Sequence, residues 1–131
     1  MPATLDHVTI SASNFAASLT FYEAALSALG LTRLAELVDE EEEDAEIEAA
    51  GWGADGARAA VWLVAGAPYG GAHLRLRADS RVEVEAFYAA AVAAGGTSSA
   101  APRRWPIYRR GEFNAIVRDP DGNLIEAVCA E

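Results

Sequence analysis

The chain has 131 residues, of which 52% are apolar and 23% charged, with a formal net charge of −10. This length suits a single domain with its own core, and the balance excludes wholesale disorder. The negative charge disfavours binding to nucleic acid through phosphate contacts. One cysteine, Cys129, excludes an internal disulfide framework, and no stretch reaches the ~18 apolar residues of a membrane span. We therefore expect a cytoplasmic, soluble protein without a membrane partner.

The first half predicts one strand, one helix and three further strands. Residues 5–11 alternate as a strand does. Asn14 then caps a helix whose apolar residues recur every three or four positions, and Gly30 ends it. The further strands are predicted at residues 31–38, 47–52 and 58–65. The acidic run at residues 39–44 is interpreted as a solvated loop.

The second half predicts the same order of elements. A strand at residues 72–78 precedes a helix that Ser80 caps, with Glu83 completing a capping box. Gly95 and Gly96 end this helix. Strands are predicted at residues 97–101, 109–118 and 123–130. The Asp-Pro-Asp-Gly run at residues 119–122 is typical of a type I turn between the last two.

The two halves are copies of one unit, offset by 66 residues. Without gaps, residues 1–65 fall on residues 67–131, and 14 of these 65 pairs are identical, six of them Ala with Ala. The only two histidines of the chain, His7 and His73, form one identical pair. We therefore predict one domain over residues 1–131, built from a βαβββ module at about 1–65 and a second at about 67–131. Its class is α+β.

Three side chains are candidates for a shared metal site. Because strand residues alternate between faces, His7 and His73 should lie on polar faces opposite the apolar residues that pack under the helices. A pseudo-twofold axis would bring the two imidazoles together, and Glu126 would join them from the last strand. This donor set suits a divalent ion such as Fe(II), Mn(II), Zn(II), Ni(II) or Co(II).

The metal interpretation competes with a simpler one. A lone strand histidine is more often structural or exposed than a ligand, whereas an inward glutamate is costly without a cation or partner. The duplicated histidine pair favours the metal site. Ala60 lies 66 residues before Glu126, so we predict that a fourth protein ligand is missing there.

Other residues should surround the ion. Arg75 shares the face of His73, while Arg58 and Trp62 alternate with Ala60, so all three should face the site. An arginine beside a metal favours an anionic substrate, although Arg75 can equally pair with a neighbouring acid. Tyr108 is a further candidate for lining the pocket, whereas Phe113 and Cys129 are expected to pack inside.

The sequence resembles the vicinal oxygen chelate superfamily, which includes glyoxalase I, extradiol dioxygenases, fosfomycin-resistance transferases and bleomycin-resistance proteins. The similar segments are LDHVTISASNFAASLTFYEAALSALGL at the start, GAHLRLRA in the middle and RDPDGNLIEAVC at the end. The resemblance implies paired βαβββ modules in a cup-shaped mixed sheet with helices outside. It also implies metal ligands at His7, His73 and Glu126, and a homodimer in which the site lies within one chain or is shared between two.

Two functions follow as alternatives. The first is a metal-dependent lyase, dioxygenase or transferase acting on a small oxygen-rich, anionic molecule, with Glu126 and Arg75 in catalytic roles and Arg58, Trp62, Arg75 and Tyr108 binding substrate. Glyoxalase I has an acidic ligand at the position of Ala60, so ordinary glyoxalase chemistry is disfavoured. The second is a binding protein that sequesters a drug or metabolite without turnover.

Overall fold

The computed structural model describes residues 1–38, 41, 43, 45–105 and 111–130. Two helices and eight strands occur in the order β1 (Val8–Ala12), α1 (Phe15–Ser27), β2 (Thr32–Val38), β3 (Ile47–Gly53), β4 (Val61–Ala65), β5 (His73–Arg77), α2 (Arg81–Ala93), β6 (Thr97–Arg104), β7 (Glu112–Arg118) and β8 (Leu124–Ala130). The predicted βαβββ pattern, repeated in tandem, is therefore confirmed. In the described part of the chain, no helix is long and apolar enough to cross a membrane.

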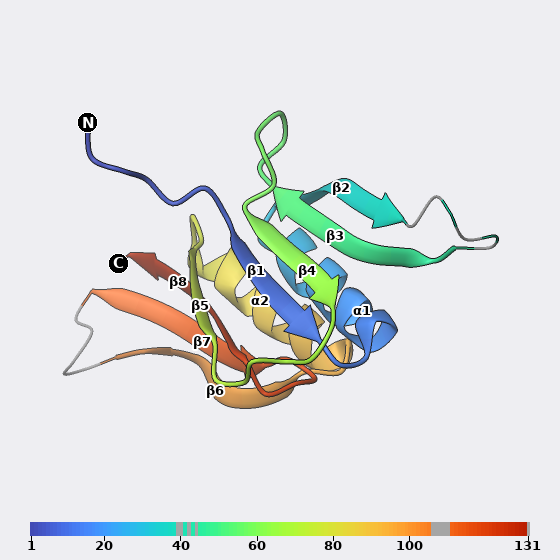
Figure 1. Ribbon diagram of the computed structural model, residues 1–131. Helices are drawn as coiled ribbons and strands as arrows, with labels where there is room; N and C mark the ends of the chain where they lie inside the picture. The colour runs from blue at the N-terminus through green and yellow to red at the C-terminus, as the bar shows by residue number, and fades with distance from the viewer. Residues whose placement is uncertain (39–40, 42, 44, 106–110, 131) are drawn as a thin grey trace.

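Each module forms its own four-stranded mixed sheet. The strand orders are β1-β4-β3-β2 and β5-β8-β7-β6. In both sheets the first strand pairs in parallel with the last strand of its module, and the other pairs are antiparallel. Figure 1 shows the helices α1 and α2 next to each other, with one sheet on either side of the pair.

The helices begin and end where the sequence predicts. The side chain of Asn14 accepts a hydrogen bond from the Ala17 N–H, and that of Ser80 accepts one from the Glu83 N–H. Glu83 accepts from the Asp79 N–H instead of the Ser80 N–H, so its capping contact lies one residue earlier than in a capping box. After α1, Gly30 has a φ of 80°, which is the left-handed C-terminal conformation that glycine favours.

The two modules share one hydrophobic core. Phe21 and Tyr22 from α1, Phe87 from α2 and Trp52 from β3 are all fully buried within it. The Tyr22 hydroxyl donates a 2.5 Å hydrogen bond to Asp119, in the turn between β7 and β8. Burial and this carboxylate raise the pKa of Tyr22, so the hydroxyl keeps its proton. The first module is thereby fixed to the second by a polar contact as well as by packing.

The connection between β3 and β4 is longer than predicted. The strand predicted at residues 58–65 begins only at Val61, because residues 54–60 form the loop. The β7–β8 connection is the tight turn that the Asp-Pro-Asp-Gly run predicts, with the Gly122 N–H donating to the Asp119 carbonyl over 3.0 Å. The duplicated modules therefore differ at this hairpin. Part of the strand predicted at residues 109–118 lies outside the described residues.

A substitution at Gly96 tests how closely the two modules pack against each other. A Cβ at this position would lie 2.5 Å from Val117 Cγ1 and 2.7 Å from Phe21 Cε2. We expect Gly96→Ala to lower the free energy of unfolding by about 1–3 kcal/mol, the usual cost of overpacking, measured by urea denaturation. Gly66→Ala is the control, because a Cβ there meets nothing within 4 Å, and it should change stability by less than about 0.5 kcal/mol. Equal effects of the two substitutions would contradict this account of the core.

Candidate functional site

The polar face of the second sheet carries a connected network of charges. We name this network the polar wall; its members are His73, Arg75, Glu112, Asn114 and Glu126. His73 and Arg75 lie on β5, Glu112 and Asn114 on β7, and Glu126 on β8. Strand pairing sets Arg75 opposite Glu126, so the alternation of side chains places them on one face.

Glu126 is the centre of the polar wall. Its side chain is fully buried, yet its carboxylate forms hydrogen bonds with His73, Arg75 and Asn114. His73 Nε2 lies 2.8 Å from Oε1, while Arg75 Nε and Asn114 Nδ2 lie 3.1 and 2.6 Å from Oε2. A buried carboxylate requires such compensation, because its desolvation is otherwise prohibitive. The sequence-based expectation that this acid needs a cation or partner is met by Arg75 within the chain itself.

Arg75 is held between two acids. Its Nη2 donates to Glu112 over 2.8 Å, in addition to the contact of Nε with Glu126. Hydrogen bonding to Glu112, and then to Glu126, raises the pKa of Arg75, so the guanidinium stays charged. Because Glu112 and Glu126 both contact Arg75, its positive charge neutralises carboxylate charge of the protein even when no ligand is bound.

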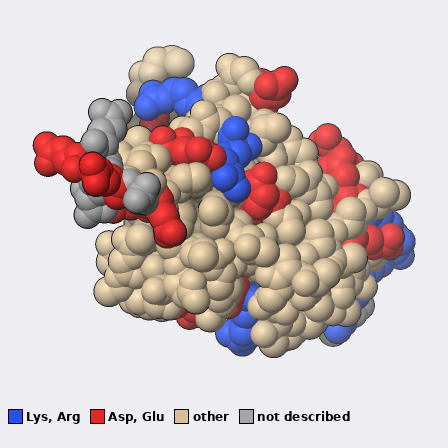
Figure 2. All heavy atoms as spheres, turned by 90° about the vertical axis from the view of Figure 1, so that its right-hand side faces the viewer, with Lys and Arg blue, Asp and Glu red and all other residues tan. Residues whose placement is uncertain are grey.

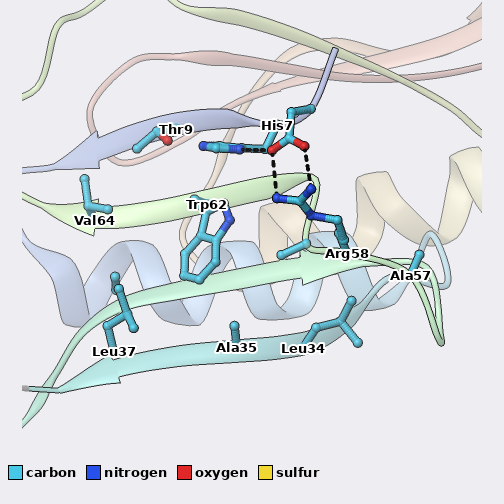
Figure 3. Close-up of a pocket in the computed structure, with 12 residues that line it drawn as sticks. His7, Thr9, Leu34, Ala35, Leu37, Ala57, Arg58, Trp62 and Val64 are labelled. Atoms are coloured by element: carbon cyan, nitrogen blue, oxygen red, sulfur yellow. Dashed lines mark hydrogen bonds and ion pairs between the residues drawn. The ribbon is translucent and has the colours of Figure 1, made fainter. Parts of the chain in front are cut away.

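The polar face of the first sheet borders a cavity of about 540 Å³. We name this lining the apolar wall, because small and apolar side chains predominate; they are Leu34, Ala35, Leu37, Ala49, Ala57, Ala59, Trp62 and Val64. Polar groups lie mainly at one end, where Asp6, His7 and Arg58 meet (Figure 3). Such a mixture of apolar surface and a few convergent polar groups is typical of small-molecule sites.

Trp62 forms a flat surface in the cavity. It pairs directly with Gly51 across β3 and β4, and a Cβ on Gly51 would lie 2.9 Å from Trp62 Cε2. The indole therefore packs directly on the backbone of Gly51, because a side chain at that position would clash with the ring. Figure 3 shows its ring between His7 and the leucines of β2.

His7 stands at the polar end of the cavity. Its Nδ1 lies 2.7 Å from Asp6 Oδ2, and Arg58 forms an ion pair with Asp6 over 3.2 Å. The hydrogen bond from His7, followed by the charge of Arg58, lowers the pKa of Asp6. All three side chains are partly open to solvent, so the cluster faces the cavity and not the core.

The structure brings only part of the predicted site together in one chain. His73, Glu126 and Arg75 are in contact, and His7, Arg58 and Trp62 line the separate cavity. Among the described residues, no group of three or more His, Cys, Asp or Glu side chains can hold a metal ion. The proposed ligand His7 thus does not join His73 and Glu126 within one chain. Tyr108 lies outside the described residues.

Most of the chain matches a known family. Residues 4–127 match the model of the Glyoxalase/Bleomycin resistance protein/Dioxygenase superfamily. The chain belongs to this superfamily. No curated protein matches it.

Solved structures of the superfamily share the fold. A glyoxalase/bleomycin resistance protein from Albidiferax ferrireducens T118 is 25% identical, with 95% of this chain and 97% of that one covered and a TM-score of 0.69. Lactoylglutathione lyase from Agrobacterium tumefaciens is 19% identical over 98% and 95% of the chains, with a TM-score of 0.66. TioX from Micromonospora sp. ML1 is 17% identical over 98% and 100%, with a TM-score of 0.67. At 19% and 17% identity, the similarity to the last two proteins shows a shared fold only.

The symmetry mate of Glu126 is Trp62, and the prediction that it is Ala60 is wrong. Arg75 pairs with Glu126, whereas Thr9, which lies 66 residues before Arg75, pairs with Trp62. The β3–β4 hairpin is one residue longer than the β7–β8 hairpin, and the first module has one more residue before β3, so β4 is shifted by two residues relative to the gapless alignment. In the first module, an aromatic ring therefore occupies the place that Glu126 occupies in the second.

Four further residues contribute to the site without having been predicted. Asp6 immediately precedes His7, and Glu112 is one of the residues that the two modules have in common, so both carried a sequence signal. Asn114 shares the face of Glu112 by alternation, and the indole of Trp105 donates a hydrogen bond to it. Nothing in the sequence connects Trp105 to Asn114, because the contact arises only when β6 and β7 pair.

The buried carboxylate should dominate the stability of the polar wall. We expect Glu126→Gln to lower the free energy of unfolding by about 1.5–3 kcal/mol, because hydrogen bonds to a buried charge are lost. Glu112→Gln is the control, since that side chain is partly exposed and contacts Arg75 alone within the wall, and it should cost less than about 1 kcal/mol. Urea denaturation at neutral pH compares them. A larger loss for Glu112→Gln would show that the wall is organised differently.

Proposed function

We propose that the protein is a homodimeric, divalent-metal-dependent enzyme in which His7 of one copy joins His73 and Glu126 of a second copy. The observation that carries the proposal is the buried Glu126 carboxylate 2.8 Å from His73 Nε2. Two ligands bound at about 2.1 Å and at right angles on one cation lie about 3.0 Å apart. The separation of these two atoms therefore fits neighbouring ligands of a single ion.

The charges of the polar wall also favour a cation. Glu112 and Glu126 carry two negative charges, against one positive charge on Arg75. A divalent ion beside these carboxylates would be attracted by them and would in turn attract an anionic, oxygen-rich substrate. A bound ion of this kind polarises substrate oxygens and stabilises negative charge. The donor set suits Zn, Fe, Mn, Ni or Co.

A second copy is required because of how the modules pack. The helices of both modules lie in one core, and the polar end of the cavity and the polar wall are on different sheets of the chain. A twofold axis that sets the cavity of one copy against the polar wall of the other would create two equal sites. His7, Arg58 and Trp62 would then form one side of each site, and His73, Arg75 and Glu126 the other.

The residues suggest how such a site would work. Arg75 would hold Glu126 in place, and Trp62 would bind the apolar part of the substrate. Glu126 would bind the ion and act on the substrate. Because Trp62 takes the place of a second acid, the site lacks the carboxylate that a glyoxalase-type proton transfer uses. Among the lyase, dioxygenase and transferase alternatives, this disfavours glyoxalase chemistry.

A heterodimer test separates shared sites from sites within one chain. Dimers of His7→Ala with His73→Ala, isolated with two affinity tags, retain one complete shared site. Dimers of wild type with the double variant contain the same number of histidines but retain none. We expect the first to bind one Co²⁺ and the second none, measured by titration and metal analysis. One Co²⁺ in the second dimer instead would place the site within a chain, and none in the wild-type dimer would exclude the metal site.

The alternative, a binding protein without turnover, is favoured by a specific observation. Glu126 already has Arg75, Asn114 and His73 as partners, so its charge is compensated without a metal. The apolar wall and the indole of Trp62 would then bind a flat apolar ligand by themselves.

The flat surface of Trp62 can be tested without a metal. We expect Trp62→Ala to weaken binding of 1-anilinonaphthalene-8-sulfonate to the metal-free protein by about tenfold, in line with an aromatic contact of about 0.5–1.5 kcal/mol and the lost apolar area. Fluorescence titration measures this. Tyr69→Ala is the control, because Tyr69 is an exposed aromatic residue outside the cavity lining. Equal affinities of both variants would exclude Trp62 as the binding surface.

A further inference from the structure

Asp6 holds the ring of His7 through one of its two nitrogens. His7 Nδ1 lies 2.7 Å from Asp6 Oδ2. An ionised carboxylate has no hydrogen to donate, so the hydrogen between these atoms belongs to Nδ1. In a neutral imidazole with Nδ1 protonated, Nε2 carries the free lone pair. The contact with Asp6 therefore selects which nitrogen can bind a ligand.

Arg58 supports this arrangement from the other side. Its Nη1 lies 3.2 Å from Asp6 Oδ1, and its Nη2 lies 3.5 Å from Asp6 Oδ2. A guanidinium that contacts both oxygens restricts the rotation of the carboxylate. Figure 3 shows the two contacts between the arginine and the carboxylate beside His7. The acid is thus held between a strand histidine and a residue of the β3–β4 loop.

The arrangement is absent from the second module. Ala72 corresponds to Asp6, and with the two-residue shift Gly122 corresponds to Arg58; neither can repeat the contacts. His73 instead uses Nε2 to contact Glu126. The two duplicated histidines therefore differ in which ring nitrogen faces a carboxylate.

We propose that Asp6, supported by Arg58, is a positioning residue that keeps His7 in the Nδ1-protonated form, with Nε2 free to bind a divalent cation. This inference rests on the proposed function for the identity of the ligand, but its effect on the ring exists without a metal. Acidic partners that fix the other nitrogen of a ligand histidine typically change metal affinity by 10–100-fold.

The ring can be observed directly, because the chain has only two histidines. At a pH where the imidazole is neutral, long-range ¹H–¹⁵N NMR of the metal-free protein should show His7 with its ring hydrogen on Nδ1 and none on Nε2. In Asp6→Ala, the ring should exchange between both neutral forms. His7→Ala assigns the signals. Asp55→Ala, which removes another exposed aspartate of the same module, should leave the ring unchanged.

Metal titration completes the test. Asp6→Ala should weaken Ni²⁺ binding by about 10–100-fold relative to wild type, whereas Asp55→Ala should not change it. A wild-type His7 that populates both neutral forms, or an unchanged ring and Ni²⁺ affinity in Asp6→Ala, would overturn the inference. If the NMR result holds but the wild-type protein binds no Ni²⁺, the metal site of the proposed function fails and the positioning of His7 by Asp6 stands.

Discussion

The packing of both helices into one core is the constraint on which the rest of the structure depends. A single βαβββ module cannot cover its own apolar face, so each module buries that face against the other. Phe21 contacts the position of Gly96, and Tyr22 donates to Asp119, so the core is closed by contacts between the modules. The polar faces of both sheets are left for ligands or for another copy.

The two polar faces have become different although they began as copies. The face of the second sheet carries a buried acid bonded to His73, Arg75 and Asn114, whereas the first borders a cavity with an indole at the equivalent place. A shift of two residues in β4, one of them from the longer β3–β4 hairpin, places Trp62 where the second module has an acid. One face thus supplies charge, and the other supplies apolar surface.

Carboxylates have different tasks in the two modules. In the second module Glu126 faces the site itself and is compensated by Arg75. In the first module Asp6 lies beside the histidine and contacts Nδ1 of its ring. Both acids are paired with an arginine, so the site combines strong local charges with little net charge. Each acid therefore has a compensating positive charge beside it.

Much of the fold was predictable from the sequence for local physical reasons. The repeat, the capping residues Asn14 and Ser80 and the Asp-Pro-Asp-Gly turn each act through near neighbours, so they are visible in one dimension. Alternation along β5 and β8 also placed His73, Arg75 and Glu126 on one face. The pairing of Arg75 with Glu126, which the sequence left open against substrate binding, required the register of the two strands.

The sequence by itself determined the duplicated modules, their helix ends and the faces of their strands, because these depend on spacing along the chain. Only the tertiary structure decided that Trp62 is the mate of Glu126, and that His7 lies apart from His73 within one chain. Loop length and packing between modules control those relations. Neither loop length nor the packing between modules can be inferred from the periodic spacing of residues in a strand or helix.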